Sequence, residues 1–255
     1  MTLFPYNLLI GENKSMSTNQ LVQVAPSKSQ LSLNIRNLDK LFSGFEEGDF
    51  AVVQGSAASA LATLLCVRGQ LPSQLCGLNS KVLFIDGGNT FDLYQVSHLA
   101  RVHHFNPKQA LDNIYISRAF TAYQITALAM QKLKQAVAKA NAKLVIISDI
   151  AGFFLDPDLP DYEAQRVFSQ LLTYLKNFAK EHKIVLVTTY LPHKKNRRNT
   201  YLHNVAVAKA NVVLSLTRTQ YYSAVSLEKH PSLKLGTVEL PSSITTLSDF
   251  IGDNA

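Results

Sequence analysis

Short apolar runs recur along the chain from Phe50 onward, separated by mixed polar stretches. Each run holds three or four consecutive residues, most of them β-branched or otherwise large, which is typical of strands buried on both faces. Between some of these runs, apolar residues follow i, i+3, i+4 spacing, which indicates amphipathic helices. The predicted strands cover 50–53, 82–85, 114–116, 144–147, 184–187 and 212–214.

The helical spacing is clearest over 125–140 and 168–179, and Pro160-Asp161 is a plausible start for the second helix. Strands that alternate with helices imply a mainly parallel sheet covered on both faces. The pattern then becomes strand, turn, strand, which predicts an antiparallel edge. The three strands of this edge are expected at about 211–217, 222–228 and 235–239.

The two ends of the chain show neither strand nor helix periodicity. Residues 1–30 are rich in Ser, Asn and Gln, so we expect a flexible amino-terminal arm. Residues 31–240 carry the strand and helix pattern of one α/β domain, and residues 241–255 are expected to form a carboxy-terminal tail.

Composition narrows the class of protein. With 47% hydrophobic and 17% charged residues among 255, the chain can bury a sizeable core, which excludes a wholly disordered protein. No apolar run approaches the roughly 18 residues that cross a bilayer. Residues 1–10 lack a basic region and a clear cleavage site, so we expect no signal peptide. A soluble intracellular protein is expected, in the cytoplasm, nucleoid or nucleus depending on the host, with no membrane partner.

Charge and cysteine content add little chemistry. The net charge of +7 is compatible with a nucleic-acid partner, although ordinary surfaces carry similar charge. Cys66 and Cys76 lie ten residues apart, outside any CxxC or His-Cys spacing. We therefore expect two reduced thiols, no metal site and no structural disulfide.

The end of the first strand resembles a phosphate-binding loop in position and length. Ligands of parallel α/β sheets bind beyond the carboxyl ends of the strands. A working GxxxxGK[ST] loop needs a second glycine, a lysine for the phosphates and a hydroxyl for magnesium. Counted from Gly55, those places hold Ala60, Leu61 and Ala62, so the chemistry is missing. The candidate cofactor-binding residues are Gly55, Ser56, Ser59, Ala60, Leu61 and Ala62, none forming an intact site.

Three other strand ends carry polar residues, at 86–90, 148–149 and 188–190. Asp149 follows an apolar strand, the usual position of a carboxylate that holds a metal-bound water, although a hydrogen-bond hub is the plainer interpretation. Gly55 is likewise expected to serve the strand-to-helix turn rather than a phosphate. Phe120 is expected in the core.

The segments "LDNIYISRAF" and "KVLFIDGGNTF", together with five others in unbroken order over about residues 33–230, resemble the RecA/RadA family of recombinases, most of all its archaeal and eukaryotic branch. "LDNIYISRAF" is similar to the family's "LDNVAYARAF", and "KVLFIDGGNTF" to the segment that ends in "IDTEGTF". The other matching segments are "LDKLFSG", "GDFAVVQG", "GQLP", "LVIISDIAGFF" and "FAKEHKIVLVTTYL". The resemblance implies a RecA-like fold, α/β, with a mainly parallel sheet, helices on both faces and an antiparallel carboxy-terminal edge.

The departures from the family pattern bear on function. The resemblance implies that Asp149 is the Walker B carboxylate, which is kept. The family's catalytic glutamate falls at Gly88, its adenine-stacking arginine near Gln95, and its γ-phosphate-sensing glutamine at Tyr190. With the degenerate Walker A loop, these changes predict a pseudo-ATPase with no catalytic residue and no cofactor beyond weak ATP and magnesium.

The densest basic cluster follows the strand that ends near residue 189, where the family places a mobile DNA-contacting loop. The expected nucleic-acid-binding residues are Lys194, Lys195, Arg197, Arg198 and Tyr201. Four cations on an exposed loop could contact successive phosphates, and the tyrosine could stack on a base. The alternative is a solvated loop beside an acidic partner surface.

Three functions stay open. The first is a non-catalytic recombinase paralogue in DNA repair and homologous recombination, which binds a RecA-family recombinase or paralogue in a hetero-oligomer and contacts single-stranded DNA. The second is a divergent ATPase that recruits its missing lysine from elsewhere. The third is a regulatory RecA-fold protein without a DNA role. Residues 3–6 are the candidate for the strand-and-phenylalanine linker through which family members polymerise.

Overall fold

The computed structural model of the chain describes residues 30–35, 37–218 and 223–240. Apart from Gln30, the predicted arm and its linker candidate lie outside the described residues, as does the predicted tail, so these remain predictions. The strands are β1 (Gln30–Leu31), β2 (Phe45–Glu46), β3 (Phe50–Gly55), β4 (Lys81–Asp86), β5 (Ile114–Arg118), β6 (Ala142–Ser148), β7 (Val185–Tyr190), β8 (Val212–Arg218), β9 (Ser223–Lys229) and β10 (Gly236–Leu240).

Within the described residues, the main sheet has the strand order β10-β9-β8-β3-β7-β6-β4-β5. The strands from β8 to β5 in this order pair in parallel, while β9 and β10 are antiparallel to their neighbours. Strands β1 and β2 form a separate antiparallel pair. The α/β class, the mainly parallel sheet and the antiparallel carboxy-terminal edge are therefore confirmed.

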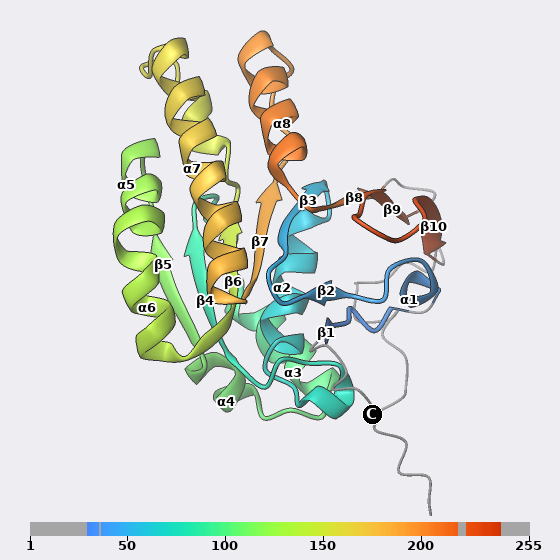
Figure 1. Cartoon of the computed structure of the whole chain (residues 1–255). Helices are drawn as coiled ribbons and strands as arrows, with labels where there is room; N and C mark the ends of the chain where they lie inside the picture. The colour runs from blue at the N-terminus through green and yellow to red at the C-terminus, as the bar shows by residue number, and fades with distance from the viewer. Residues whose placement is uncertain (1–29, 36, 219–222, 241–255) are drawn as a thin grey trace, which may run out of the picture.

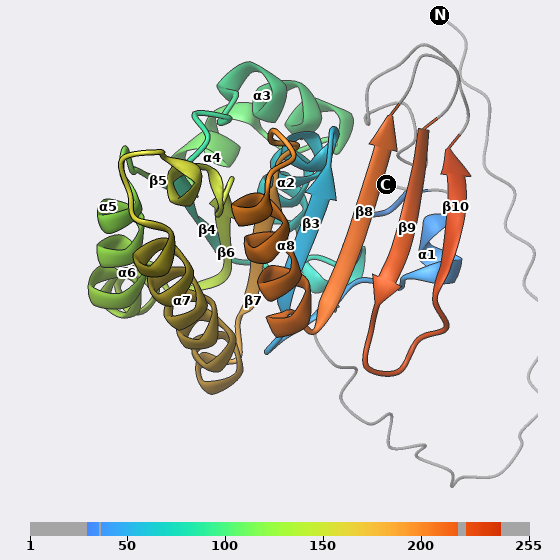
Figure 2. The ribbon, with the colours of Figure 1, turned by 90° about the horizontal axis from the view of Figure 1, so that it is seen from above.

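Helices cover both faces of the sheet (Figure 2). They are α1 (Leu38–Leu41), α2 (Ala58–Arg68), α3 (Leu93–Val102), α4 (Pro107–Asp112), α5 (Ala122–Ala127), α6 (Leu133–Ala140), α7 (Asp161–His182) and α8 (Arg197–Lys209). Two apolar clusters fill the spaces between the layers. One joins the sheet to α2, α3 and α4, and the other joins it to α5, α6, α7 and α8. The protein is thus a three-layer sandwich (Figure 1).

Helix α7 illustrates how the sequence sets an element. Pro160 is the N-cap residue, and the acidic residues Asp161 and Glu163 lie in the first turn. Their negative charges interact favourably with the positive end of the helix dipole. Lys183 ends it in the left-handed conformation at φ 51°. One stripe of side chains is buried against the sheet, as predicted from the spacing: Ala164, Phe168, Leu171, Leu172, Leu175, Phe178 and Ala179.

The helix predicted over 125–140 is also present, with a difference in its middle. Residues Leu128–Lys132 form a π-helical stretch, η2, between α5 and α6. Such a stretch inserts an extra residue per turn and shifts the faces of the flanking helices relative to each other. The i, i+3, i+4 pattern alone carries no sign of this insertion.

The prediction of strands buried on both faces is wrong for β5. Only Ile114 of this strand is buried, and Tyr115 and Ile116 are 46% and 44% exposed. The reason is topological, because β5 is the last strand of the sheet and pairs only with β4 among the described residues. In the described part of the chain, no helix is long and apolar enough to cross a bilayer.

Candidate functional site

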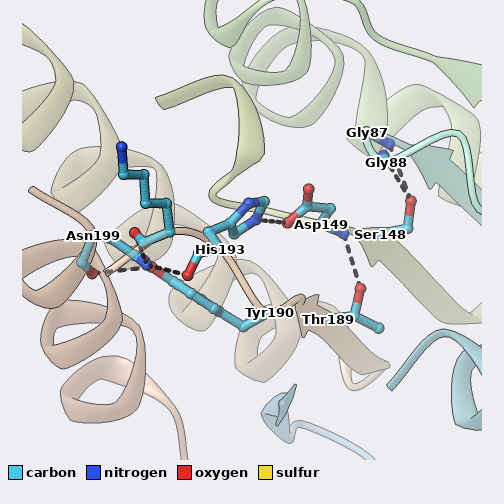
Figure 3. Close-up of polar contacts among 9 residues, drawn as sticks. Gly87, Gly88, Ser148, Asp149, Thr189, Tyr190, His193 and Asn199 are labelled. Carbon is cyan, nitrogen blue, oxygen red and sulfur yellow. Dashed lines mark hydrogen bonds and ion pairs between the residues drawn. The ribbon is translucent and has the colours of Figure 1, made fainter. Parts of the chain in front are cut away.

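The carboxyl ends of β3, β7, β6 and β4 lie side by side, because these strands are parallel neighbours in the sheet. Side chains predicted from separate parts of the chain are therefore brought together at this edge. Figure 3 shows the polar contacts that join the ends of β4, β6 and β7 to the start of α8.

The segment that should cradle a phosphate is short. Strand β3 ends at Gly55 and α2 already begins at Ala58, so only two residues lie between them. The backbone N–H of Leu61 donates a helical hydrogen bond to the carbonyl of Ala57, at 3.2 Å. The side chain of Leu61 is fully buried in the core beneath the sheet. Position 61 is thus a core position.

Gly55 is required by backbone geometry. Its φ of +104° is a conformation that other residues rarely adopt. A Cβ built there would lie 2.1 Å from the carbonyl oxygen of Leu216 on β8. The hydroxyl of Ser56 accepts a hydrogen bond from the N–H of Arg218 at 3.3 Å, which also holds this turn against β8. These contacts agree with the turn interpretation of Gly55.

Asp149 is the centre of a hydrogen-bonded network. It is 6% exposed, with φ +45°, and its N–H donates to the hydroxyl of Thr189 at 2.9 Å. Its carboxylate contacts Nε2 of His193 at 2.7 Å. The hydrogen-bond hub that the sequence suggested is therefore observed. The partner His193 was missed, since 44 residues separate the two and no local spacing links them.

The neighbouring strand end holds a second buried carboxylate. Asp86, 1% exposed, accepts hydrogen bonds from the hydroxyl of Ser148 at 2.8 Å and from the N–H of Thr90 at 2.9 Å. The same hydroxyl accepts from the N–H groups of Gly87 and Gly88, at 3.1 and 3.2 Å (Figure 3). The carboxylate of Asp86 is thus satisfied by its neighbours, while the buried hydroxyl of Thr90 has no hydrogen-bond partner among the described residues.

Space at Gly88 is limited. A Cβ added there would lie 2.9 Å from Cβ of Asp149 and 2.9 Å from Cγ2 of Thr90. Real Cβ atoms do not approach other carbons this closely without a shift of the surroundings. A longer side chain at position 88, glutamate included, therefore requires movement of the β6 end.

Tyr190, at the end of β7, is 4% exposed, and its hydroxyl donates to Oδ1 of Asn199 at 2.6 Å. Burial raises the pKa of this tyrosine, and the charge of Asp149 raises it further. The ring packs edge-on against His203, with centroids 5.2 Å apart. His203 in turn contacts Oε1 of Gln54 at 2.6 Å. Position 190 joins β7 to α8.

The basic segment differs from the exposed loop that we expected. Arg197, Arg198 and Tyr201 lie in α8, which begins at residue 197 because Asn196 caps it by accepting from the N–H of Asn199 at 2.7 Å. Lys194, Lys195 and Arg197 are exposed, and Tyr201 is 41% exposed.

The side chain of Arg198 is only 14% exposed. It pairs with Asp161 and donates to the carbonyls of Asp156 and Leu159, at 2.6 and 2.7 Å, and of Phe154 at 3.4 Å. The prediction that all four cations are exposed on a loop is wrong for this residue, because its donors are occupied by the segment before α7.

The expectation that Phe120 lies in the core is also wrong. Its side chain is 70% exposed at the turn that follows the edge strand β5. The N–H of Phe120 is held by Oε1 of Gln124 at 2.8 Å, which fixes the turn and leaves the ring outside. Among the described residues, no group of three or more His, Cys, Asp or Glu side chains is arranged to hold a metal ion.

The chain is similar to known proteins. Residues 28–213 match the family model described as Rad51. The chain is also 29% identical over 151 residues to the "DNA repair and recombination protein RadA" of the archaeon Aeropyrum pernix. That alignment covers 56% of this chain and 46% of the relative, so the chain spans about half the length of the curated relative that it matches.

Proposed function

The chain belongs to the Rad51 family, and we propose that it acts there as a non-catalytic paralogue in DNA repair and homologous recombination. In this role it is a pseudo-ATPase that binds a RecA-family partner and single-stranded DNA. The observation that carries the proposal is the early start of α2. It buries Leu61 in the core, whereas a working loop has a lysine at this position that contacts the phosphates.

The energetic consequence is large. A charge-assisted hydrogen bond contributes roughly 1.5–3 kcal/mol. Without the lysine and the magnesium-bound hydroxyl, ATP binding is weaker by about 3–6 kcal/mol, a factor of ~10² to ~10⁴. Without a glutamate at position 88, no side chain there orients the attacking water, which slows any residual hydrolysis further.

Calorimetric titration of the full chain with ATP and magnesium tests this step. We expect no saturable binding at sub-millimolar concentration and no hydrolysis above background, with an active RadA protein as the positive control under the same conditions. Micromolar affinity would contradict the pseudo-ATPase proposal and favour a divergent ATPase.

The surface beside β5 supports a protein partner. This edge strand has one side unpaired among the described residues, and an apolar cavity of about 330 Å³ lies between β4, β5 and α6. Lys132 and Lys139 are among its lining residues. We propose that an extended segment of a RecA-family partner adds a strand to β5 and places an apolar side chain in this cavity, because unpaired strand edges recruit further strands.

Two alanine-to-glutamate substitutions on α6 test the proposed partner surface. Ala136 lines the cavity, while Ala138 is exposed on the same helix outside it. We expect Ala136→Glu to abolish co-purification of a RecA-family protein from the native host and Ala138→Glu to leave it unchanged. Equal recovery with both variants would place the partner elsewhere.

The DNA interface is proposed with three cations in place of four, because Arg198 is held by the protein itself. If Lys194, Lys195 and Arg197 neutralise three phosphates of a single strand, the log–log salt slope is about −0.7 × 3, near −2. Affinity then falls about twentyfold between 50 and 200 mM salt. Tyr201 lies one turn further along α8, and we expect it to stack on a base.

Fluorescence anisotropy with a labelled single strand measures this slope. The triple glutamine variant at the three exposed cations is expected to lose binding while it keeps the fold, because those side chains are exposed. An unchanged slope in the folded variant would move the DNA surface elsewhere. No binding at 50 mM salt, with or without the partner, would favour a purely protein-binding role.

A further inference from the structure

A second cavity, of about 220 Å³, lies where α2 and α3 end, and Ser32, Asp39, Arg68, Cys76 and His103 are among the residues that line it. Arg68 is the last of the 11 residues of α2, and the degenerate phosphate loop precedes the first. The cavity is therefore about 16 Å along the helix from the site described above. It is a separate feature of the molecule.

Arg68 lies at this cavity, and part of its guanidinium has no hydrogen-bond partner among the described residues. The residue is 3% exposed. Its Nε donates to the carbonyl of Ser32 at 3.0 Å and its Nη2 to the carbonyl of Leu75 at 2.6 Å. A guanidinium has five N–H donors, so the Nη1/Nη2 edge keeps a fork that fits a carboxylate. Burial lowers the pKa of Arg68, and the charges of Cys76 and Asp39 raise it.

His103 adds an unsatisfied ring nitrogen. The residue is 7% exposed, and its Nε2 has no hydrogen-bond partner among the described residues. Burial lowers the pKa of His103 to about 4, helped by the charges of Arg68 and His104, so the ring is neutral at pH 7. Buried polar atoms are normally paired. His103 lines the cavity, so one hydrogen-bonding group there has no partner among the described residues.

Cys76 is the exposed free thiol at the cavity. Its residue is exposed, with φ +55°. Its N–H donates to the carbonyl of Ser73 at 2.9 Å, and its carbonyl accepts from the N–H of Ser32 at 3.0 Å, so its backbone is fixed. Reactive cysteines lie in electropositive, partly exposed surroundings, and here the positive group is Arg68. The other cysteine, Cys66, is fully buried.

We propose that Cys76 is a modification site that forms a mixed disulfide with a small, carboxylate-bearing thiol seated in this cavity. The co-reactant is the symmetric disulfide of that thiol. The Cys76 thiol loses its proton to solvent, the sulfur attacks one sulfur of the co-reactant, and the S–S bond of the co-reactant breaks. One new S–S bond forms at Cys76, and the other half leaves as a thiolate, so there is no net change of oxidation state.

The carboxylate of the bound half is held by the free fork of Arg68, and His103 contacts its polar groups. Two features disfavour the binding of an anion in this cavity. One is the exposed carboxylate of Asp39, and the other is the negative dipole end of each of the helices α2 and α3. Selectivity for the acidic thiol therefore depends on Arg68 and is limited by Asp39. Both effects can be measured separately.

The test uses the full reduced chain and two probes, oxidised glutathione and the neutral 2-hydroxyethyl disulfide. Rates of mixed-disulfide formation are followed by intact mass and located by peptide mapping, and each is divided by the rate with free N-acetylcysteine. We expect modification at Cys76 and none at Cys66. The normalised rate is expected to favour the glutathione probe by about tenfold, the effect of one charge-assisted hydrogen bond.

Two substitutions assign this preference. Arg68→Lys keeps the charge but loses the fork, and we expect it to remove most of the preference. Because Arg68 also anchors Ser32, that variant can fail to fold. Asp39→Asn, at the exposed rim, is the independent test: we expect it to raise the rate with the glutathione probe and leave the neutral probe unchanged. Normalised rates equal for both probes, or no effect of Asp39→Asn, would overturn the proposal.

Discussion

Arg198 joins α8 to the segment between β6 and α7, and its replacement tests this joint. In Arg198→Ala, the carbonyls of Asp156 and Leu159 lose their short hydrogen bonds and Phe154 loses a longer one. The ion pair with Asp161 is lost as well. The free energy of unfolding should fall, because the three carbonyls lose a charged donor, although that of Asp156 keeps the N–H of Leu159 at 3.1 Å.

The magnitude follows from the exposure of the partners. The side chain of Arg198 is 14% exposed, and that of Asp161 is 69% exposed. The exposed ion pair contributes at most about 1 kcal/mol. Two short hydrogen bonds from a charged donor contribute roughly 1.5–3 kcal/mol each, less what water recovers after truncation. We expect a total loss of about 2–4 kcal/mol.

The neighbouring Arg197 is the matched control, since it is an arginine on the same helix but exposed. Arg197→Ala should change the free energy of unfolding by less than about 0.5 kcal/mol. Urea denaturation followed by circular dichroism measures both variants, and the slope m confirms that the same surface unfolds. If the two variants lose stability equally, Arg198 is not the joint described above. The DNA assay should give the reverse ranking, with the loss in Arg197→Ala.

Two further outcomes are expected. Burial keeps His103 neutral in the folded protein, with a pKa of about 4, while the unfolded chain binds a proton near pH 6.5. The free energy of unfolding is therefore highest above pH 6.5 and falls by up to about 3 kcal/mol as the pH drops towards 4. Urea midpoints measured against pH should show this fall in the wild type and in the His104→Gln control but not in His103→Asn. Gly55→Ala places a Cβ against the carbonyl of Leu216 at a φ of +104°, so the free energy of unfolding should fall by about 2–4 kcal/mol. A thermal midpoint within 2 °C of the wild type, which corresponds to a change on the order of 0.5 kcal/mol, would contradict this account of the turn.

The order of strands and helices was predictable because it depends on local periodicity. Apolar runs and helical spacing placed β3, β4, β6, β7 and β8 and the long helix α7 close to their observed bounds. The absence of a lysine at position 61 was also visible directly in the sequence. What local patterns lack is the place of a strand in the sheet, which is why Tyr115 and Phe120 are exposed against expectation.

The contacts of the candidate site needed the tertiary structure. Asp149 and His193 are 44 residues apart and meet because β6 and β7 are neighbours in the sheet. Arg198 looks like a DNA-contacting cation in the sequence, but folding brings its guanidinium onto carbonyls some 40 residues away. Residue type and local spacing determined which groups are present and which element carries each one. Strand order and helix packing decided which of those groups are satisfied within the protein and which stay free, because hydrogen bonds and ion pairs depend on distance in space and not on separation along the chain.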